Sequence, residues 1–251
     1  MKRLPIALQL YSVREDCARD LAGTLKAVAE MGYAGVEFAG WHNHPAADLK
    51  KMLADNGLRP AGAHIQLAQF EPANWEANAD FNQALGNRYL IVPGIPAERR
   101  KTLDDWRRLA DFFNQMAEKA AARDLRIGYH NHWMEFELLE GRRPWDVFFD
   151  ATRREVIMQF DTGNALRGGG LAADYLQRYA GRAETVHLKE YSSAQPKALI
   201  GEGEVPWPAV FELCETIGGT QWYIVEEEYR PYPPMESVRR SLEALRAMGK
   251  I

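Results

Sequence analysis

Eight short β-type runs, separated by helical patterns, occupy most of the 251 residues of this chain. Several runs are continuously apolar, as expected for parallel strands that are buried on both faces. A strand–helix unit repeated eight times predicts a (β/α)8 barrel, a fold that takes about 250 residues. The predicted strands cover residues 5–13, 34–40, 59–67, 88–94, 125–132, 155–161, 183–189 and 221–227.

The segments between these runs carry helix start and stop signals. Asp20 precedes the segment 21–31, whose apolar residues fall on one face and which Gly32 ends. Proline is tolerated in the first turn of a helix, and glycine or asparagine often ends one. Further helices are predicted at 46–57, after Thr102, after Pro208 and after Pro234. The segments after the fifth and sixth strands give weaker signals.

A doubly wound open sheet is the main alternative fold. It would place a GxGxxG turn after the first strand and gather functional residues at one switch point. The chain has no GxGxxG after residues 5–13, and its candidate functional residues are spread over most strand ends. We therefore expect one α/β domain over residues 1–251, a (β/α)8 TIM barrel.

Four apolar runs end in residues that can bind a metal: His130, Asp161, His187 and Glu226. Each alone has a simpler interpretation, such as a core histidine, a helix-capping aspartate or a solvated acidic loop. Their spacing is about that of one strand–helix–strand repeat, roughly 30 residues. Because the C-termini of barrel strands meet on one face, this spacing predicts a metal site.

The four predicted ligands offer imidazole nitrogen and carboxylate oxygen, and no thiolate. This set suits Mn²⁺, our first choice, as well as Zn²⁺, Co²⁺ or Fe²⁺, better than Ca²⁺. Open coordination positions would accept the carbonyl and hydroxyl oxygens of a sugar. The metal would then act as a Lewis acid and stabilise an enediolate.

The order and spacing of seven short motifs resemble the sugar phosphate isomerase/epimerase family of xylose-isomerase-like TIM barrels. The motifs span nearly the whole chain and read LQLYSVR, GVEF, YHNHWMEFE, FDTGNA, VHLKE, GEGEVPW and IVEEE. Relatives include ketose 3-epimerases, hydroxypyruvate isomerases, inosose dehydratases and apurinic endonucleases. The resemblance implies one divalent metal on strands five to eight, held here by His130, Asp161, His187 and Glu226.

The fifth-strand position departs from the family pattern. Ketose epimerases have a glutamate there, within Glu-Asn-His, that both binds metal and transfers a proton, whereas this chain has His130-Asn131-His132. A histidine can bind the metal, but the symmetric transfer between two glutamates no longer follows from the resemblance. Glu135 is the alternative source of a carboxylate, and its simpler interpretation is an exposed loop residue.

Proton abstraction next to a carbonyl needs a base within hydrogen-bond reach. Glu226 is the first candidate, with Glu135, His132 or Lys189 as the opposing catalytic group. Other residues near strand ends are candidates for substrate contact, although hydrogen bonding or packing within the protein would also explain them. They are Glu37, His64, the glycine-flanked Glu202, and the aromatic residues Tyr11, Trp41 and Trp133.

These features predict a metal-dependent isomerase or epimerase acting on a sugar, polyol or keto-sugar through an enediolate. The alternative is a keto-sugar or inosose dehydratase or lyase that uses the same metal site. An apurinic endonuclease is disfavoured by the net charge of −4 and only six histidines. A non-catalytic sugar-binding barrel is disfavoured by the complete ligand set.

The expected partner is a small sugar or polyol, without nucleic acid or membrane. The chain has no apolar stretch of about 18 residues that would suggest a membrane span. Its first sixteen residues do not have the pattern of a signal peptide, so we expect a cytoplasmic protein. Aromatic residues near the predicted loops are compatible with a homodimer.

Overall fold

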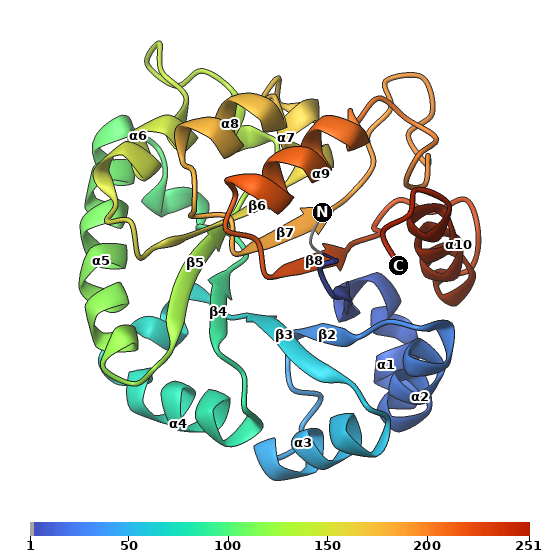
Figure 1. Cartoon of the computed structure of the whole chain (residues 1–251). Coiled ribbons are helices and arrows are strands. Elements are labelled where there is room, and N and C mark those ends of the chain that lie inside the picture. Colours follow the sequence, from blue (N-terminus) through green and yellow to red (C-terminus); the bar gives the residue numbers. More distant parts are fainter. Residues whose placement is uncertain (1–2) are drawn as a thin grey trace.

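The computed structural model describes residues 3–251, in which eight parallel strands form a closed barrel in sequence order. Helices surround the barrel, as Figure 1 shows in a view along its axis. The predicted (β/α)8 fold is therefore confirmed, while Met1 and Lys2 lie outside the described residues. The strands are β1 (Ile6–Gln9), β2 (Gly35–Ala39), β3 (Arg59–His64), β4 (Tyr89–Val92), β5 (Arg126–His130), β6 (Ile157–Asp161), β7 (Thr185–Leu188) and β8 (Trp222–Val225).

Ten α-helices lie between or after the described strands, and five of them agree closely with the predicted segments. The helix between β3 and β4 was not specified from the sequence, and the weak segments after β5 and β6 contain three short helices. The helices are α1 (Arg14–Arg19), α2 (Leu21–Met31), α3 (Ala46–Asp55), α4 (Trp75–Leu85), α5 (Leu103–Ala121), α6 (Pro144–Ala151), α7 (Thr162–Arg167), α8 (Ala172–Arg178), α9 (Trp207–Thr216) and α10 (Pro234–Ala247).

The first predicted strand, residues 5–13, is strand only over Ile6–Gln9. The segment Leu10–Val13 turns into a 3-10 helix. The side chain of Gln9 accepts a hydrogen bond from the backbone N–H of Tyr11 at 3.0 Å, which stabilises this turn. A side chain that bonds the backbone two residues on ends the strand, although the apolar pattern continues.

The interior of the barrel changes from apolar to polar along the strands. Near the strand N-termini, a separate cluster of buried apolar side chains includes Ala7, Ile157 and Ile224. Because side chains alternate along a strand, the inward positions two residues further on are Gln9, Gln159 and Glu226. The strand C-termini therefore carry the polar groups, as is usual for barrels with a functional site on that face.

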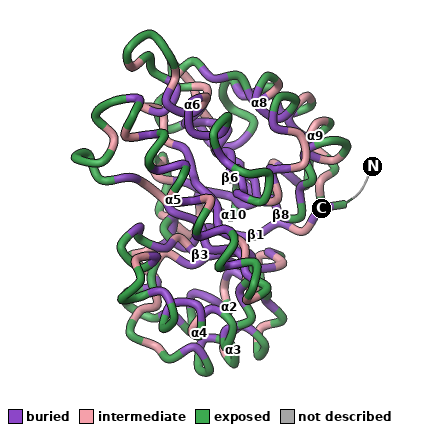
Figure 2. The backbone as a smooth tube through the Cα atoms, turned by 90° about the vertical axis from the view of Figure 1, so that its left-hand side faces the viewer, coloured by how far each residue is buried: buried purple, intermediate pink, exposed green. Residues whose placement is uncertain are grey.

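The outer faces of the strands pack against the helices through the main hydrophobic core. Figure 2 shows the buried strands in the middle of the molecule and exposed residues on the outer turns of the helices and in the loops. In α5, for example, Leu109 and Phe113 are buried on the barrel side. No helix within residues 3–251 is long and apolar enough to cross a membrane.

Candidate metal centre

Four potential metal ligands meet at the C-terminal ends of four consecutive strands. His130 ends β5, Asp161 ends β6, His187 lies near the end of β7 and Glu226 directly follows β8. One donor atom from each lies within 4.8 Å of the others, and all four residues are buried. The convergence predicted from the spacing is thus present in the structure, whereas metal binding by these residues stays a prediction.

Asp161 has one oxygen that is satisfied and one that is not. Its Oδ1 accepts a hydrogen bond of 2.7 Å from the backbone N–H of Asn164 and caps α7. Its Oδ2 is buried without a hydrogen-bond partner in the described chain and lies 3.9 Å from Nε2 of His130. Burial raises the pKa of this carboxyl to about 7, although the Lys189 ammonium acts in the opposite direction. A buried carboxylate oxygen without a partner fits a bound cation at this point.

His187 bridges two carboxylates. Its Nδ1 lies 2.6 Å from Oε2 of Glu226, and its Nε2 lies 2.6 Å from Oε2 of Glu37. Burial alone would lower the pKa of this imidazole, but Glu37 and Glu226 outweigh burial and raise it to about 10. In the structure His187 therefore carries the positive charge between the two carboxylates, which a metal ion would replace on the Nδ1 side.

Glu226 is ionised despite its burial. Burial acts to raise the pKa of its carboxyl, but Lys189, His187 and His130 hold that pKa well below the usual range. Oε1 of Glu226 lies 4.0 Å from the Lys189 ammonium, which also pairs with Glu228. A charged carboxylate can accept a proton or bind a cation.

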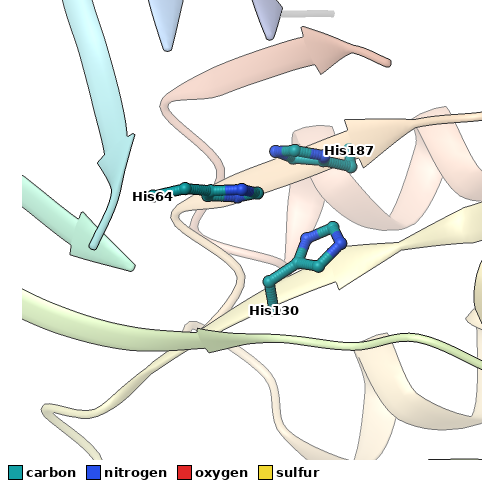
Figure 3. Close-up of side chains that lie close together, drawn as sticks. All are labelled: His64, His130 and His187. Atoms are coloured by element: carbon teal, nitrogen blue, oxygen red, sulfur yellow. The ribbon is translucent and has the colours of Figure 1, made fainter. Parts of the chain in front are cut away.

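His130 is a neutral imidazole at neutral pH. Burial, together with the neighbouring His187 and His64, lowers its pKa well below the usual value. Its Nδ1 lies 3.1 Å from Oε1 of Gln159, and its Nε2 lies 4.0 Å from Oε2 of Glu226. Figure 3 shows how the rings of His64, His130 and His187 come from three strands and lie close together.

Lys189 is buried beside these acidic residues. Burial alone would lower the pKa of its ammonium, but Glu226, Asp161 and Glu228 outweigh burial and raise that pKa. Lys189 is therefore a charged group at the edge of the ligand cluster. Of its three acidic neighbours, Glu228 was not predicted from the sequence, because the run Glu226-Glu227-Glu228 also suits a solvated loop.

Two cavities adjoin this cluster. One, of about 400 Å³, is lined by Tyr11, Ala39, Gly40, His64, Gln66, Pro93, His130, His132, Glu226 and Glu228. A second, of about 370 Å³, is lined by Lys189 and by residues such as Arg167 and Tyr229, and by none of the four ligands. A larger cavity, of about 800 Å³, lies beside α9 and contains none of the four ligands. The chemistry of the ligands, not the cavity size, identifies the candidate site.

Glu37, a predicted substrate contact, lies beneath the cavities and lines none of those described above. It is fully buried, and its oxygens accept from Gln9 at 2.6 Å, Gln159 at 2.7 Å and His187 at 2.6 Å. Gly62 on β3 makes room for it, because a Cβ atom there would lie 2.6 Å from Oε1 of Glu37. The structure therefore places Glu37 behind the ligands.

Glu135 is also turned away from the ligand cluster. It is buried, and its carboxylate accepts from the hydroxyl of Tyr129 at 2.6 Å and from the backbone N–H of His132 at 2.8 Å. It belongs to the 3-10 helix Met134–Phe136 that follows β5. The exposed-loop interpretation is wrong, and the carboxylate is not among the four clustered ligands.

The remaining predicted substrate contacts are dispersed. His64 and Tyr11 line the first cavity, with Tyr11 41% exposed. Trp41 packs against Phe38 and Phe81, whereas Trp133 lies under the guanidinium of Arg167 at 5.1 Å. Glu202 is exposed and accepts from the backbone N–H of Leu199 at 3.0 Å. Of these, the structure brings His64 and Tyr11 to the cavity beside the ligands.

Gln9 and Gln159 were not predicted from the sequence as parts of the site. Both are fully buried amides at inward positions, and Gln159 lies two residues before Asp161 on the same face of β6. A glutamine inside an otherwise apolar strand was the available signal, because a buried amide needs specific partners. Those partners come from other strands, so the strand sequence alone did not name them.

The donor set is consistent with a divalent cation. Metal–ligand bonds of about 2.1 Å place donor atoms roughly 3–4 Å apart, so small shifts would close the present cluster around an ion. Two imidazoles and two carboxylates favour Zn²⁺, Mn²⁺, Fe²⁺ or Co²⁺. The residues therefore fit the predicted cofactor class without selecting one metal.

A closed barrel with such a cluster at its strand C-termini defines the class of (β/α)8 barrels that carry an active site on this face. The model of the family described as xylose isomerase-like TIM barrel matches residues 25–248. The chain belongs to this family.

Individual relatives are distant. An inosose dehydratase from Clostridium botulinum is 23% identical over 247 residues, covering 82% of this chain and 82% of the relative. A sugar phosphate isomerase/epimerase from Parabacteroides distasonis has a TM-score of 0.86 at 24% identity, covering 100% of this chain and 96% of that chain. The IOLI protein, whose structure is described with a binding zinc atom, has a TM-score of 0.77 at 12% identity, covering 98% and 99%. The two structures share the fold, and the family includes isomerases, epimerases and dehydratases.

Proposed function

We propose that this chain is a divalent-metal-dependent enzyme that removes a proton next to the carbonyl of a keto-sugar or a cyclic polyol ketone. The observation that carries the proposal is the cluster of His130, Asp161, His187 and Glu226 beside a cavity of about 400 Å³. A bound divalent cation would polarise the substrate carbonyl and lower the pKa of the adjacent C–H.

Glu226 is the proposed base. Its carboxylate lines the cavity, is ionised, and is held by the 2.6 Å contact with Nδ1 of His187. It would accept the proton while the C–H electrons form the double bond of the enediolate. The proton acceptor is thus positioned by a residue of the neighbouring strand.

Elimination of a β-hydroxyl or β-alkoxyl is the outcome that the site supports best. The fifth strand supplies His130 instead of a second carboxylate, and Glu135 is engaged by Tyr129 and His132. The carbonyl would then re-form while the electrons of the enolate double bond shift to a new double bond between the α- and β-carbons. The β C–O bond would break with its electrons on oxygen, and the departing oxygen would take a proton from Lys189. The name inosose dehydratase among curated relatives supports this preference.

Isomerisation or epimerisation is the second candidate. His132 lines the same cavity as Glu226 and offers a second group that could return a proton to the substrate. The similarity to sugar phosphate isomerase/epimerase structures is in line with this candidate. Both candidates require the same first step, proton removal by Glu226.

The predicted metals stay Mn²⁺ as first choice, followed by Zn²⁺, Co²⁺ and Fe²⁺. The bound zinc of one structural relative supports zinc as an alternative. The proposed substrate is a small sugar or polyol, and the cytoplasmic location and the homodimer remain part of the proposal. Metal analysis of the purified protein by mass spectrometry tests which of these metals is bound.

The decisive experiment measures the exchange of the hydrogen on the substrate's α-carbon with deuterium from the solvent. Metal-loaded protein is incubated with keto-sugars and inososes in D₂O, and recovered compounds are analysed by NMR. We expect deuterium at the α-carbon, together with an α,β-unsaturated ketone if elimination occurs. A Glu226→Gln variant serves as the control without the base. Turnover of any substrate without α-deuterium and without loss of the α-hydrogen would contradict the enediolate step.

A further inference from the structure

Gln159 lies at the centre of a buried hydrogen-bond relay below the ligand cluster. Its Nε2 lies 2.7 Å from Oε1 of Glu37 and 3.0 Å from Oγ1 of Thr185. Its Oε1 lies 3.1 Å from Nδ1 of His130 and 2.8 Å from Nε2 of His64. Gln159 therefore connects one carboxylate with two histidines through both ends of its amide.

Glu37 determines which way the Gln159 amide faces. An ionised carboxylate can only accept hydrogen bonds, so the Gln159 atom next to it must be the NH₂ group. Glu37 acts as an acceptor in the structure: the Gln9 amide, whose oxygen accepts from the backbone N–H of Tyr11, donates its NH₂ to Oε2 of Glu37 at 2.6 Å. Nε2 of His187 lies 2.6 Å from the same oxygen. The amide oxygen then has to face the two histidines.

The amide oxygen in turn determines the tautomer of His130. Because Oε1 of Gln159 can only accept, Nδ1 of His130 must donate its proton to that oxygen. The lone pair of the neutral ring is left on Nε2, which lies 3.9 Å from Oδ2 of Asp161 and 4.0 Å from Oε2 of Glu226. The nitrogen that faces the other ligands is thus the one able to bind a metal.

Glu37 acts on the second histidine directly. Its Oε2 accepts from Nε2 of His187 at 2.6 Å, which leaves Nδ1 as the nitrogen directed at Glu226. A carboxylate behind a ligating histidine fixes the ring and increases its basicity. One buried carboxylate therefore orients both histidines, His187 directly and His130 through an amide.

We propose that Glu37 and Gln159 form a positioning relay that presets the tautomer of His130 and the ring orientation of His187 before any metal binds. Neither residue lines the cavity beside the ligands, and both are fully buried. The relay gives a physical reason why a histidine can stand at the fifth-strand position: a neutral imidazole needs its tautomer fixed, whereas a carboxylate does not. This inference rests on the metal site proposed above.

The first test reads the tautomer in the wild-type, metal-free protein. Histidine labelled with ¹⁵N is incorporated, and His130 is assigned by comparison with a His130→Gln variant. We expect ring shifts of a neutral imidazole protonated on Nδ1. A His130 ring protonated on Nε2 overturns the relay, and this reading depends neither on activity nor on metal binding.

The second test removes the Gln159 amide and uses Gln9 as a matched control. Gln159→Met keeps the side-chain length but cannot fix His130. Gln9→Met also removes a buried amide that donates to Glu37, at 2.6 Å, yet Gln9 makes no hydrogen bond to a histidine in the described chain. Both variants lose one donor to Glu37 and one further hydrogen bond, to Thr185 for Gln159 and from Tyr11 for Gln9, but only Gln159→Met loses contacts with histidines.

Co²⁺ affinity, followed by visible absorption, separates the two variants. Loss of such an outer-layer partner weakens metal affinity by roughly 10–100-fold, so we expect this for Gln159→Met. We expect less than about a threefold change for Gln9→Met, since the ligating histidines keep their partners. Equal affinities for wild type and Gln159→Met, or equal losses in both variants, contradict the relay.

The outcomes also separate the relay from the proposed function. Wild-type protein that binds no Co²⁺, Mn²⁺ or Zn²⁺ contradicts the proposed metal site. In that case the ¹⁵N shifts of His130 still confirm or overturn the relay as a structural feature. If Gln159→Met fails to fold, the wild-type tautomer of His130 decides: a ring protonated on Nδ1 supports the relay, and a ring protonated on Nε2 overturns it.

Discussion

Two layers of side chains fill the same barrel but depend on different interactions. The lower layer, near the strand N-termini, consists of apolar groups such as Ala61, Ile91 and Ile157. The upper layer, two residues further along the strands, contains Glu37, Gln159 and the ligand cluster. Hydrophobic burial is non-directional, whereas each buried donor needs one particular acceptor. The lower layer stabilises the barrel, and the upper layer determines where individual atoms lie.

The comparison predicts that the upper layer tolerates substitution far less than the lower one. Removing one partner of a buried charged pair costs about 3–5 kcal/mol, because the other charge stays uncompensated. Shortening a buried aliphatic side chain by one methyl group costs about 0.5–1.5 kcal/mol. Glu37→Gln and Ile157→Val test this difference in stability, and two further substitutions separate metal binding from catalysis within the upper layer.

Glu37→Gln should have the largest effect on folding. The neutral amide cannot accept from both Gln159 and His187, so the free energy of unfolding should fall by about 3–5 kcal/mol. Urea denaturation measures this change. Glu135→Gln is the matched control, because it alters another buried carboxylate that accepts two hydrogen bonds, and about 1–3 kcal/mol is expected. If both variants lose the same free energy of unfolding, Glu37 is no more important for stability than Glu135.

Lys189→Met should separate metal binding from catalysis within the upper layer. Loss of a proton donor lowers turnover by roughly 10²–10⁴-fold. Metal affinity should stay equal or increase, because a positive charge 4.0 Å from Glu226 disappears. Steady-state kinetics and Co²⁺ titration measure the two effects. Lys250→Met, which breaks the 2.6 Å ion pair with Glu215, is the control. A Lys189→Met variant with wild-type turnover would exclude Lys189 as the acid.

Asp161→Asn should remove the stabilisation that a metal provides, without destabilising the metal-free protein. Metal at about 100 times its Kd stabilises a protein by about 2.7 kcal/mol, and this increment should vanish. Asparagine keeps the Oδ1 acceptor for Asn164 and replaces the unpartnered, buried Oδ2. Thermal unfolding without and with Mn²⁺ measures the stability of the metal-free protein and the increase that the metal provides. Asp20→Asn, which changes another helix-capping aspartate, is the control. A persistent metal-dependent increase in Tm would remove Asp161 from the ligand set.

Ile157→Val should have the smallest effect and should be confined to stability. The lost methyl group costs about 0.5–1.5 kcal/mol, measured by urea denaturation. Co²⁺ affinity should not change, although Ile157 lies only two residues before Gln159 on the same face of β6. A tenfold loss of affinity would show that packing in the lower layer also positions the ligands, and the two layers would then act as one.

The ligand cluster could be predicted because it follows from strand order. Parallel strands that are neighbours in sequence are neighbours in the barrel, so His130, Asp161, His187 and Glu226 converge whatever the details of the packing. The same reasoning found His64, which ends β3. To predict these residues, only the strand boundaries and the residue types that bind metals were needed.

The surroundings of the ligands could not be predicted in the same way. Glu37 and Gln159 are 122 residues apart in sequence, and their hydrogen bond crosses the barrel from β2 to β6. Glu135 follows His130 closely, yet the turn after β5 directs its carboxylate to Tyr129. Both outcomes depend on side-chain directions and not on position along the chain.

The sequence by itself determined a (β/α)8 barrel and four potential ligands on one of its faces, because side-chain periodicity and strand order are local properties that add up along the chain. Only the tertiary structure decided that Glu37 lies behind the ligands, that Glu135 is engaged elsewhere and that Gln159 contacts His130. The physical reason is that buried hydrogen bonds pair groups from distant strands, and such pairs exist only once the barrel has closed.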